Sequence, residues 1–403
     1  MTGAMYSAIA GLRTHMTALN VIGNNISNVN TVGYKSSRYT FNESLYTMSR
    51  SGSNGTNTLG GRNPAQVGYG CSVGTIDLNM STATYSPTGR ALDCMVDGDG
   101  FFIVGDKGEG LGGNGTKESP FVTASGITTQ NQLQGMELTR VGDFDFKDGF
   151  LVDGQGNVVY GFLTVRDDSG EGENGGAAGF NEAGALQQET TRVSNILTAI
   201  RLPMVEKVRV LIEEGEGDND DIFATQYVFH YPQVTEVGLV RDQIDGTPIS
   251  EDAEEDTITY ERLSPDSVAI DNTGKITAIT EDGTTITVGY IAIAKVDSPN
   301  GVTHENGHFY VAQDGAGYTR LTTIGNSVPY LRGSEDETGD YPTELDIGDA
   351  GGTTMWTSGL ESSNTDLATE ISNMIVIQRG YQANTRIVTV TDSMLEELVN
   401  MKR

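Results

Sequence analysis

Residues 359–403 read GLESSNTDLATEISNMIVIQRGYQANTRIVTVTDSMLEELVNMKR, and this stretch contains no proline. Within it, large side chains recur at every seventh position: Leu360, Leu367, Met374, Tyr381, Val388 and Leu395. Seven-residue spacing is typical of one seam of a coiled coil. The stretch is therefore predicted to form a single helix about 60 Å long.

The second seam of this predicted helix is half polar, and its members are Asn364, Ile371, Gln378, Thr385, Asp392 and Val399. Further apolar residues lie outside both seams: Ile375, Ile377, Ile387, Met394 and Leu398. A two-stranded coiled coil would leave these side chains uncovered. The pattern therefore predicts a helix that packs against several neighbours.

The N-terminal segment carries an apolar stripe with spacings of three and four: Met5, Ile9, Leu12, Met16, Leu19, Ile22, Ile26 and Val29. This predicts an amphipathic helix of about 25 residues, with Gly33 near its C-terminal end. Two arrangements remain open, a helical hairpin within one chain and a set of helices shared by several chains. The broad apolar faces of both helices favour the second.

Between the helices, the spacing of apolar residues changes. Residues 34–70 are rich in Ser, Gly, Asn and Thr and are predicted to form an extended connector. Residues 71–163 alternate between apolar and polar and contain Asp-Gly and Gly-Asn turns, as expected of an antiparallel β-domain. Residues 164–264 are acidic and are predicted to form an inserted outer β-domain, after which 265–358 complete the first one.

The sequence therefore predicts an α+β multidomain protein. Residues 1–33 and 359–403 would form a coiled-coil-like inner domain that mediates polymerisation, and two nested, mainly antiparallel β-domains would lie between them.

Charge and hydropathy exclude some classes of partner. The chain has 403 residues and a formal net charge of -30, which disfavours binding to nucleic acid or to an anionic membrane. The acids are unevenly distributed, since Glu43 is the only one before residue 77. No apolar run is long enough for a membrane span, and the N-terminus lacks the pattern of a cleavable signal peptide. We therefore expect no membrane insertion.

Motifs that suggest catalysis have the wrong context. His304 to His308 fit the zinc-protease pattern H-E-x-x-H, but an Asn-Gly pair between the histidines and a following Phe-Tyr-Val predict a turn and a strand. Gly108, Gly110 and Gly113 fit a dinucleotide-binding pattern, but no helix can follow them. We therefore expect no catalytic residue, metal or cofactor.

The two cysteines are too few for a disulfide framework. Cys94 lies in an alternating strand pattern, so a buried thiol is expected there, and a Cys71–Cys94 bridge remains an unsupported alternative.

Several segments resemble one protein family. The segment ALNVIGNNISNVNTVGYKSSRYTF near the N-terminus and residues 360–401 resemble the two ends of the bacterial flagellar axial proteins, which include rod, hook and hook-associated subunits. LDCMVDGDGFFIV and LTRVGDFDFKDGFLVDGQGNVVYG are similar to the β-strand module of rod and hook proteins. The inserted segment 164–264 and the loop 107–134 resemble nothing in this family.

The resemblance implies a non-enzymatic structural subunit. Rod proteins of the family are usually shorter and lack a large insert, so the insert favours a hook subunit over a distal-rod or other axial subunit. A secreted metalloenzyme with flagellar-type ends is a remote alternative. The implied product is a curved, flexible tube that acts as a universal joint and transmits motor torque to the filament.

The implied location is extracellular, in the hook and basal body of the flagellum, reached through type III export. The implied partners are further copies of the chain, rod, hook-cap and hook–filament junction proteins, and the export apparatus. Residues expected in the helical core between subunits are Ile9, Leu12, Met16, Leu19, Ile22, Ile26, Leu367, Ile371, Met374, Tyr381, Val388 and Leu395. Residues expected to close the first helix and begin the connector are Asn24, Asn25, Asn28, Asn30 and Gly33.

Overall fold

The computed structural model divides into two compact units that are described separately. Unit 1 comprises Met1–Ala83 and Ser362–Arg403, and unit 2 comprises Thr84–Glu361. The described residues are 2–55, 60–105, 136–147, 149–166, 179–180, 186–187, 191–194, 197–213, 222–231, 233–235, 238–240, 259–262, 267–280, 283–305, 307–324 and 352–401. The predicted α+β class is confirmed.

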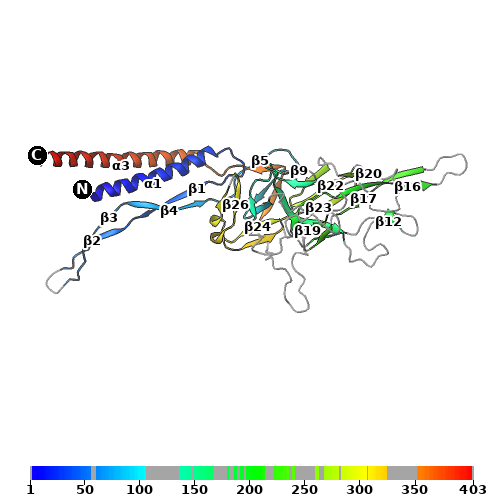
Figure 1. Cartoon of the computed structure of the whole chain (residues 1–403), viewed down its shortest axis with the longest axis horizontal. Coiled ribbons are helices and arrows are strands. Elements are labelled where there is room, and N and C mark those ends of the chain that lie inside the picture. Colours follow the sequence, from blue (N-terminus) through cyan, green and yellow to red (C-terminus); the bar gives the residue numbers. More distant parts are fainter. Residues whose placement is uncertain are drawn as a thin grey trace. The chain divides into compact units, whose positions relative to one another are not determined.

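Two long helices form one side of unit 1. Helix α1 spans Thr2–Ser27 and helix α3 spans Leu367–Met401. At 1.5 Å per residue, α3 is roughly 50 Å long. The helices pack together and run antiparallel, so the two ends of the chain lie at the same end of the pair (Figure 1). The helical hairpin within one chain, which the sequence left open, is therefore present.

The C-terminal helix begins later than the sequence predicted. Gly359–Glu361 form strand β29, which pairs with β5 (Tyr85–Pro87) in unit 2, so Leu360 is not a member of the helical seam. Asp366 sets the start of α3, because its carboxylate accepts hydrogen bonds from the Ala368 backbone at 3.0 Å and from the Thr369 hydroxyl at 2.5 Å. This is N-cap chemistry, and the heptad count could not reveal it.

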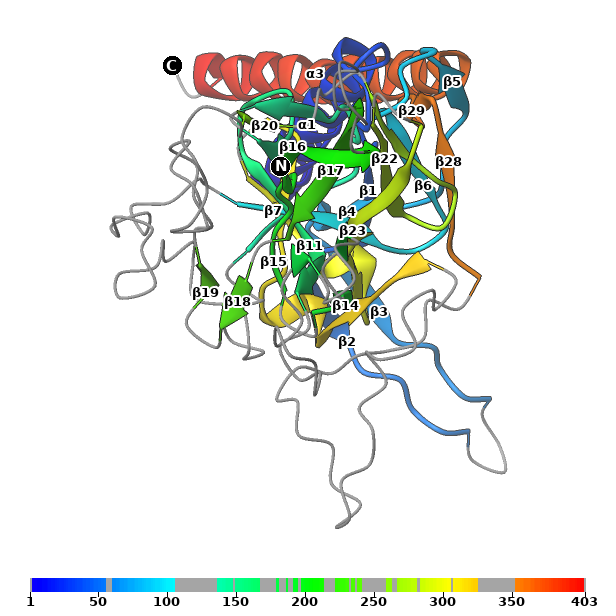
Figure 2. The same cartoon turned by 90° about the vertical axis from the view of Figure 1, so that its right-hand side faces the viewer.

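Unit 1 also contains two β-ladders from the segment that follows α1. Strand β1 pairs with β4 and β2 pairs with β3, and the second pair is visible as two adjacent ribbons in both views (Figures 1 and 2). The predicted connector, residues 34–70, thus holds three strands, and one of them pairs with a strand of the predicted first β-domain. The strands are β1 (Ser37–Glu43), β2 (Tyr46–Arg50), β3 (Ala65–Gly68) and β4 (Cys71–Leu78).

The β1–β4 ladder lies along α1 with an apolar face toward the helix. Tyr39 opposes Ile76 in the ladder, and Tyr39 packs on the buried cluster between the helices. The Thr14 hydroxyl donates a hydrogen bond to the Cys71 carbonyl at 3.2 Å, which ties the helix to the strand. The opposite face is polar and includes an Arg38–Asp77 ion pair at 3.4 Å. Helix α1 therefore contacts both α3 and the ladder.

Unit 2 is built from antiparallel strands. Its first strands are β5, β6 (Cys94–Asp97), β7 (Phe101–Gly105), β8 (Glu137–Thr139), β9 (Asp145–Lys147), β10 (Phe150–Val152), β11 (Val158–Arg166), β12 (Gly179–Phe180), β13 (Leu186–Gln187), β14 (Thr191–Val193) and β15 (Thr198–Ala199). The remaining strands are β16 (Met204–Glu213), β17 (Ile222–His230), β18 (Gln233–Thr235), β19 (Gly238–Val240), β20 (Thr259–Arg262), β21 (Val268–Ile270), β22 (Lys275–Ile279), β23 (Thr285–Ile291), β24 (Ile293–Val296), β25 (Thr303–His304), β26 (Phe309–Val311), β27 (Thr319–Thr322), β28 (Thr354–Thr357) and β29.

The largest sheet of unit 2 joins strands that are distant in sequence. Its path is β21-β22-β23-β11-β7-β8-β26-β25, and β7 is buried along its whole length. Strands before residue 167 and after residue 267 therefore share this sheet. Strands β17, β16 and β20 pair among themselves in a separate sheet. The predicted boundaries of the nested domains remain a prediction.

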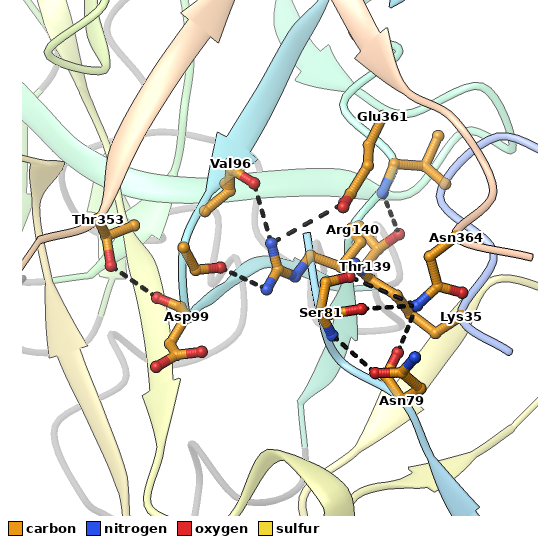
Figure 3. Close-up of polar contacts among 12 residues, drawn as sticks. Lys35, Asn79, Ser81, Val96, Asp99, Thr139, Arg140, Thr353, Glu361 and Asn364 are labelled. Carbon is orange, nitrogen blue, oxygen red and sulfur yellow. Dashed lines mark hydrogen bonds and ion pairs between the residues drawn. The ribbon is translucent and has the colours of Figure 1, made fainter. Parts of the chain in front are cut away.

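A buried arginine connects several segments of unit 2. Arg140 follows β8, is 1% exposed, and donates hydrogen bonds to the carbonyl oxygens of Val96 at 3.0 Å and Gly98 at 2.6 Å. Its guanidinium also lies 3.9 Å from the carboxylate of buried Glu361 (Figure 3). Arg140 thereby holds the residue at which the chain leaves unit 2.

Candidate assembly interface

Three contacts define the register of the helix pair. A Cβ atom placed on Gly11 would lie 2.5 Å from the Asn384 side chain, and one on Gly380 would lie 2.8 Å from the His15 ring. Further along, the Asn25 amide donates a hydrogen bond to Glu370 Oε1 at 2.9 Å. The residue number on α3 falls by as much as the number on α1 rises, so all three contacts belong to one antiparallel register.

The apolar part of this interface is small. Ala18, Ile22 and Ile377 form a buried cluster, against which Leu19, Ile26, Met374 and Tyr39 pack. Small residues on α1 let the two backbones approach closely, since Ala8, Gly11 and Ala18 are all buried. The helix pair is therefore held by a narrow seam.

The residues that the sequence assigned to the helical core fall into three groups within one chain. Ile22 is buried, and Ile9, Leu12, Leu19, Ile26, Met374, Val388 and Leu395 are half-buried. Met16 is 58% exposed, and the other exposed members are Leu367, Ile371 and Tyr381. The structure thus brings only part of the predicted set together, and assignment of the rest to contacts between subunits remains a prediction.

Sequence reasoning included Ile22 but missed the small residues of α1 that face α3. The predicted stripe followed large apolar side chains, whereas the seam uses Ala8, Gly11 and Ala18. A signal was present, because Ala4, Ala8, Gly11, His15, Ala18, Ile22 and Asn25 also follow spacings of four and three. Small residues at such spacing mark close helix packing, but a search for large apolar residues passes over them.

Much of the apolar surface of α3 faces away from α1. The exposed large apolar residues outside the predicted set are Ile375, Val376, Ile387, Val390, Met394, Leu398, Val399 and Met401. Val376, for example, is 68% exposed. Many exposed large apolar residues on one helix indicate an interaction site.

Asn25 closes one end of the helix pair with a full set of hydrogen bonds. Its amide nitrogen donates to Glu370 and to the Ser37 carbonyl, both at 2.9 Å. Its amide oxygen accepts from the Ser37 backbone at 2.9 Å and from the Tyr34 hydroxyl at 3.1 Å. A side chain that is 1% exposed, as Asn25 is, requires such satisfaction.

The carboxylate of Glu370 affects two tyrosines at this end. Burial raises the pKa of Tyr34, and the negative charge of Glu370 raises it further. The pKa of Tyr39 is raised by the same two causes in the same order. Both phenols therefore stay neutral and serve as packing and hydrogen-bonding groups.

Asn364 joins three segments of unit 1 just before α3. Its Oδ1 accepts a hydrogen bond from the Ser36 backbone at 2.7 Å. Its Nδ2 donates a hydrogen bond to the Asn79 carbonyl at 2.6 Å (Figure 3). Nearby, Lys35 is 1% exposed and its ammonium donates to the Ser81 carbonyl at 2.8 Å. These polar contacts fix the start of α3 against the segments that flank the β1–β4 ladder.

The other residues assigned to the helix end lie at or after the last turn of α1. Asn24 is the last-turn residue whose carbonyl accepts hydrogen bonds from the backbone and the side chain of Asn28, at 3.1 and 3.0 Å. Asn30 is exposed in the following turn. Gly33 has φ 68°, a left-handed conformation that favours glycine, and it leads into the first strand.

His15 is the titratable group inside the helix pair. Its ring lies against Gly380 and 5.7 Å from the Phe41 ring, and its Nδ1 is buried with no hydrogen-bond partner among the described residues. Burial lowers the pKa of His15. The imidazole is therefore neutral at neutral pH.

The H-E-x-x-H fragment lies on a hairpin, as the sequence predicted. Thr303 pairs with Val311 and His304 with Tyr310 in the β25–β26 ladder, so the two histidines do not share a helical face. His308 instead lies 4.0 Å from the carboxylate of Asp153. Within the described ranges, no cluster of three or more His, Cys, Asp or Glu residues could hold a metal ion.

Other motifs give little further chemistry. Cys94 is buried and burial raises its pKa well above the ordinary value, while Cys71 is half-buried and both thiols are free. The predicted loop 107–134, with its three glycines, lies outside the described residues. No helix in the part of the chain that the structure describes is long and apolar enough to cross a membrane.

Two family descriptions match the ends of the chain. Residues 5–35 match "Flagella basal body rod protein", and residues 358–401 match "Flagellar basal body rod FlgEFG protein C-terminal". These matches cover most of α1 and all of α3.

Relatives match along the whole chain. The flagellar basal-body rod protein FlgG of Bacillus subtilis (strain 168) is 28% identical over 405 residues and covers 100% of both chains. The flagellar hook protein FlgE of Borreliella burgdorferi is 26% identical over 475 residues, and that of Treponema pallidum is 22% identical over 497, each again covering 100% of both chains.

A solved structure is also similar. The crystal structure of Helicobacter pylori flagellar hook protein FlgE2 is 12% identical and covers 69% of this chain and 100% of that chain. Its TM-score is 0.29, which is too low to support inference about the fold.

Proposed function

Because the chain belongs to the family of flagellar rod and hook proteins, we propose that it polymerises into the flagellar hook. The proteins of this family are structural and non-enzymatic. Full-length relatives include both rod and hook proteins, so the choice of the hook depends on further argument.

The exposed apolar surface of α3 carries the proposal. Fully burying one Leu, Ile or Val side chain is worth about 1.5–3 kcal/mol, and eight such side chains on α3 are more than 40% exposed. Contacts with α1 cannot cover them, since that helix occupies the face that contains Ile377. Further copies of the same chain would bury this surface and so stabilise a polymer.

In this proposed mechanism, the terminal helices of neighbouring subunits would form concentric inner tubes around a central channel. The subunits would leave the cell through type III export and add at the distal end beneath the hook cap. The segment 34–70 would bridge neighbouring subunits, and the outer β-domains would slide as the tube bends and transmits torque. The rod and the hook–filament junction proteins would then be partners at the two ends.

The inserted segment 164–264 favours the hook over the rod. Strands β16, β17 and β20 within it form their own sheet, which adds mass away from the terminal helices in sequence. Rod subunits of the family that this sequence resembles are usually shorter and lack such an insert. The match to a rod protein along the whole chain keeps a distal-rod subunit as the second candidate.

Polymerisation tests the role of α3. Purified full chain is expected to form curved tubes that sediment and are visible by electron microscopy, and removal of residues 367–403 is expected to abolish them. This truncation retains β29, so unit 2 keeps its last strand. A truncated chain that still formed tubes would contradict the proposal.

A pair of point variants refines the same test. Ile375→Glu places a charge on the exposed apolar surface and is expected to prevent sedimentation, because burying an unpaired carboxylate is costly. Gln382→Glu adds the same charge at an exposed polar position of the same helix and should leave assembly nearly intact. Equal loss in both variants would mean that charge alone prevents assembly.

A deletion strain separates the hook from the rod. If the chain is a hook subunit, electron microscopy should show basal bodies with complete rods and no hooks. Missing rods would instead assign the chain to the rod and would leave its role as an axial subunit unchanged.

A further inference from the structure

Helices α1 and α3 could in principle pair in more than one register. The α1 residues that meet α3 recur with spacings of three and four, and the α3 residues Glu370, Ile377 and Asn384, which meet α1, are spaced by seven. Sliding one helix by seven residues would therefore again juxtapose two seams of the same periodicity. Apolar burial alone discriminates weakly between such registers, which in paired helices are set by polar residues within the seam.

Two glycines help to select one register, because each makes room for a side chain of the other helix. Gly11 on α1 accommodates the Asn384 side chain, whose nitrogen would lie 2.5 Å from an added Cβ. Four residues further on, His15 of α1 lies over Gly380, where an added Cβ would lie 2.8 Å from two ring atoms. Each helix thus inserts one bulky polar side chain opposite a glycine of the other, one turn apart.

The hydrogen bond between Asn25 and Glu370 fits the same register, at the C-terminal end of α1 and the start of α3. After a slip of seven residues in one direction, Asn25 would face Ile377, and after a slip in the other direction Glu370 would face Ala18. Either change places a polar group opposite an apolar residue of the buried seam. A buried polar group without its partner is destabilising, so both slips are disfavoured.

We infer that the reciprocal contacts Gly11–Asn384 and His15–Gly380, together with Asn25–Glu370, select the antiparallel register of α1 and α3. This inference deepens the proposed function, since the register sets which apolar residues of α3 face outward. The contacts that carry it lie within a single chain.

The decisive variant adds one methyl group. Gly11→Ala should clash with Asn384 in the present register, and the additional change Asn384→Ala should remove the clash. Gly23→Ala is the matched control, because Gly23 is also in α1 but has no neighbouring atom within 4 Å of an added Cβ. All three changes replace residues by a good helix former, so helix propensity does not explain a difference between them.

Pairs of engineered cysteines report the register without altering these residues. The register places Ala4 opposite Thr391, so Ala4→Cys with Thr391→Cys should form a disulfide on mild oxidation. Ala4→Cys with Leu398→Cys tests a slip of seven residues. Half-buried Cys71 is replaced by Ser in every chain, so that it cannot compete. Both the soluble full chain and the sedimented polymer are oxidised.

In the parent and in Gly23→Ala, the 4–391 disulfide is expected and the 4–398 disulfide is not. In Gly11→Ala, the yield of the 4–391 disulfide should fall several-fold, and Asn384→Ala should restore it. The appearance of 4–398 in Gly11→Ala would identify the slipped state directly. Failure of the parent to form 4–391, equal yields in Gly11→Ala and Gly23→Ala, or absence of rescue would overturn the inference.

Assembly provides a separate result. A parent chain that forms 4–391 but no tubes would refute the proposed function and leave the register selection intact. A parent that forms tubes, with unchanged disulfide yields in Gly11→Ala, would refute the register selection alone.

Discussion

His15 makes the helix pair sensitive to acid. Its folded-state pKa is lowered by burial from the ordinary value of 6.5. The stability contributed by the neutral ring is therefore complete above the unfolded-state pKa and is lost as the pH falls through the folded-state pKa. Unit 1 should thus unfold more easily in urea at about pH 5 than at about pH 7.5.

The measurement is helical circular dichroism during urea titration, in the parent and in His15→Gln. The variant cannot be protonated at this position, so its midpoint should fall less between the two pH values. His308→Gln serves as the control, because the pKa of His308 is also lowered by burial but the residue lies in unit 2. A parallel fall in the parent and in His15→Gln would exclude His15 as the cause.

Arg140 is expected to be the most sensitive charged residue of unit 2. Arg140→Met would remove both hydrogen bonds to Val96 and Gly98 and the cation next to Glu361. Breaking a buried ion pair by removing one partner typically costs about 3–5 kcal/mol. The free energy of unfolding of unit 2 should fall by this amount in urea titrations followed by tryptophan fluorescence of Trp356.

The matched control is Arg320→Met. Arg320 and Asp297 form an ion pair at 3.0 Å in which both side chains are substantially exposed. Exposed pairs contribute about 0–1 kcal/mol, so this variant should be nearly as stable as the parent. Similar losses in the two variants would show that burial of Arg140 does not determine its effect.

At the scale of elements, α3 depends on the residues just before it. Asn364→Ala would leave the Ser36 amide and the Asn79 carbonyl without their side-chain partner. Because these two hydrogen bonds are only partly shielded from water, their loss should cost about 0.5–1.5 kcal/mol each. Hydrogen exchange should therefore become faster in the first turns of α3 and in β1, whereas Asn373→Ala, at an exposed position of α3, should not change it.

The same helix shows which features of the fold can be read from sequence. The seven-residue repeat predicted α3, but its first member, Leu360, lies in β29, because N-capping by Asp366 sets the start of the helix. The apolar stripe predicted α1 and included Ile22 of the buried seam, but it passed over the small seam residues Ala8, Gly11 and Ala18. Hydrophobic periodicity reports where large apolar side chains lie. Close helix packing, in contrast, depends on where small residues lie.

The strands were also only partly predictable from the sequence. Alternation and turn residues predicted an antiparallel β-protein, and the hairpin context of His304 and His308 is confirmed. The segment 34–70 was predicted to be an extended connector because it is polar, yet β1 pairs with β4 and contacts α1. Its polar face is supported by cross-strand contacts such as Arg38–Asp77, which composition alone does not reveal.

At the scale of the whole molecule, the two units should unfold separately. Unit 1 has a narrow helical seam and many exposed apolar side chains, whereas unit 2 contains most of the buried apolar residues. Heating the soluble chain should therefore give two transitions, with the helical signal lost first. A fragment of residues 84–361 should retain the upper transition, and a single transition shared by both signals would contradict this.

The pairing of β5 with β29 has a mechanical consequence. The chain enters unit 2 just before Tyr85 and leaves it just after Glu361, and Tyr85 and Glu361 are ladder partners. Tension applied through unit 1 would thus pull two adjacent strands in the same direction, and each strand would bear part of the load. The bonds between these strands would be spared, and the force would pass to their anchors, the Tyr85–Thr357 hydrogen bond at 2.7 Å and the Arg140–Glu361 pair.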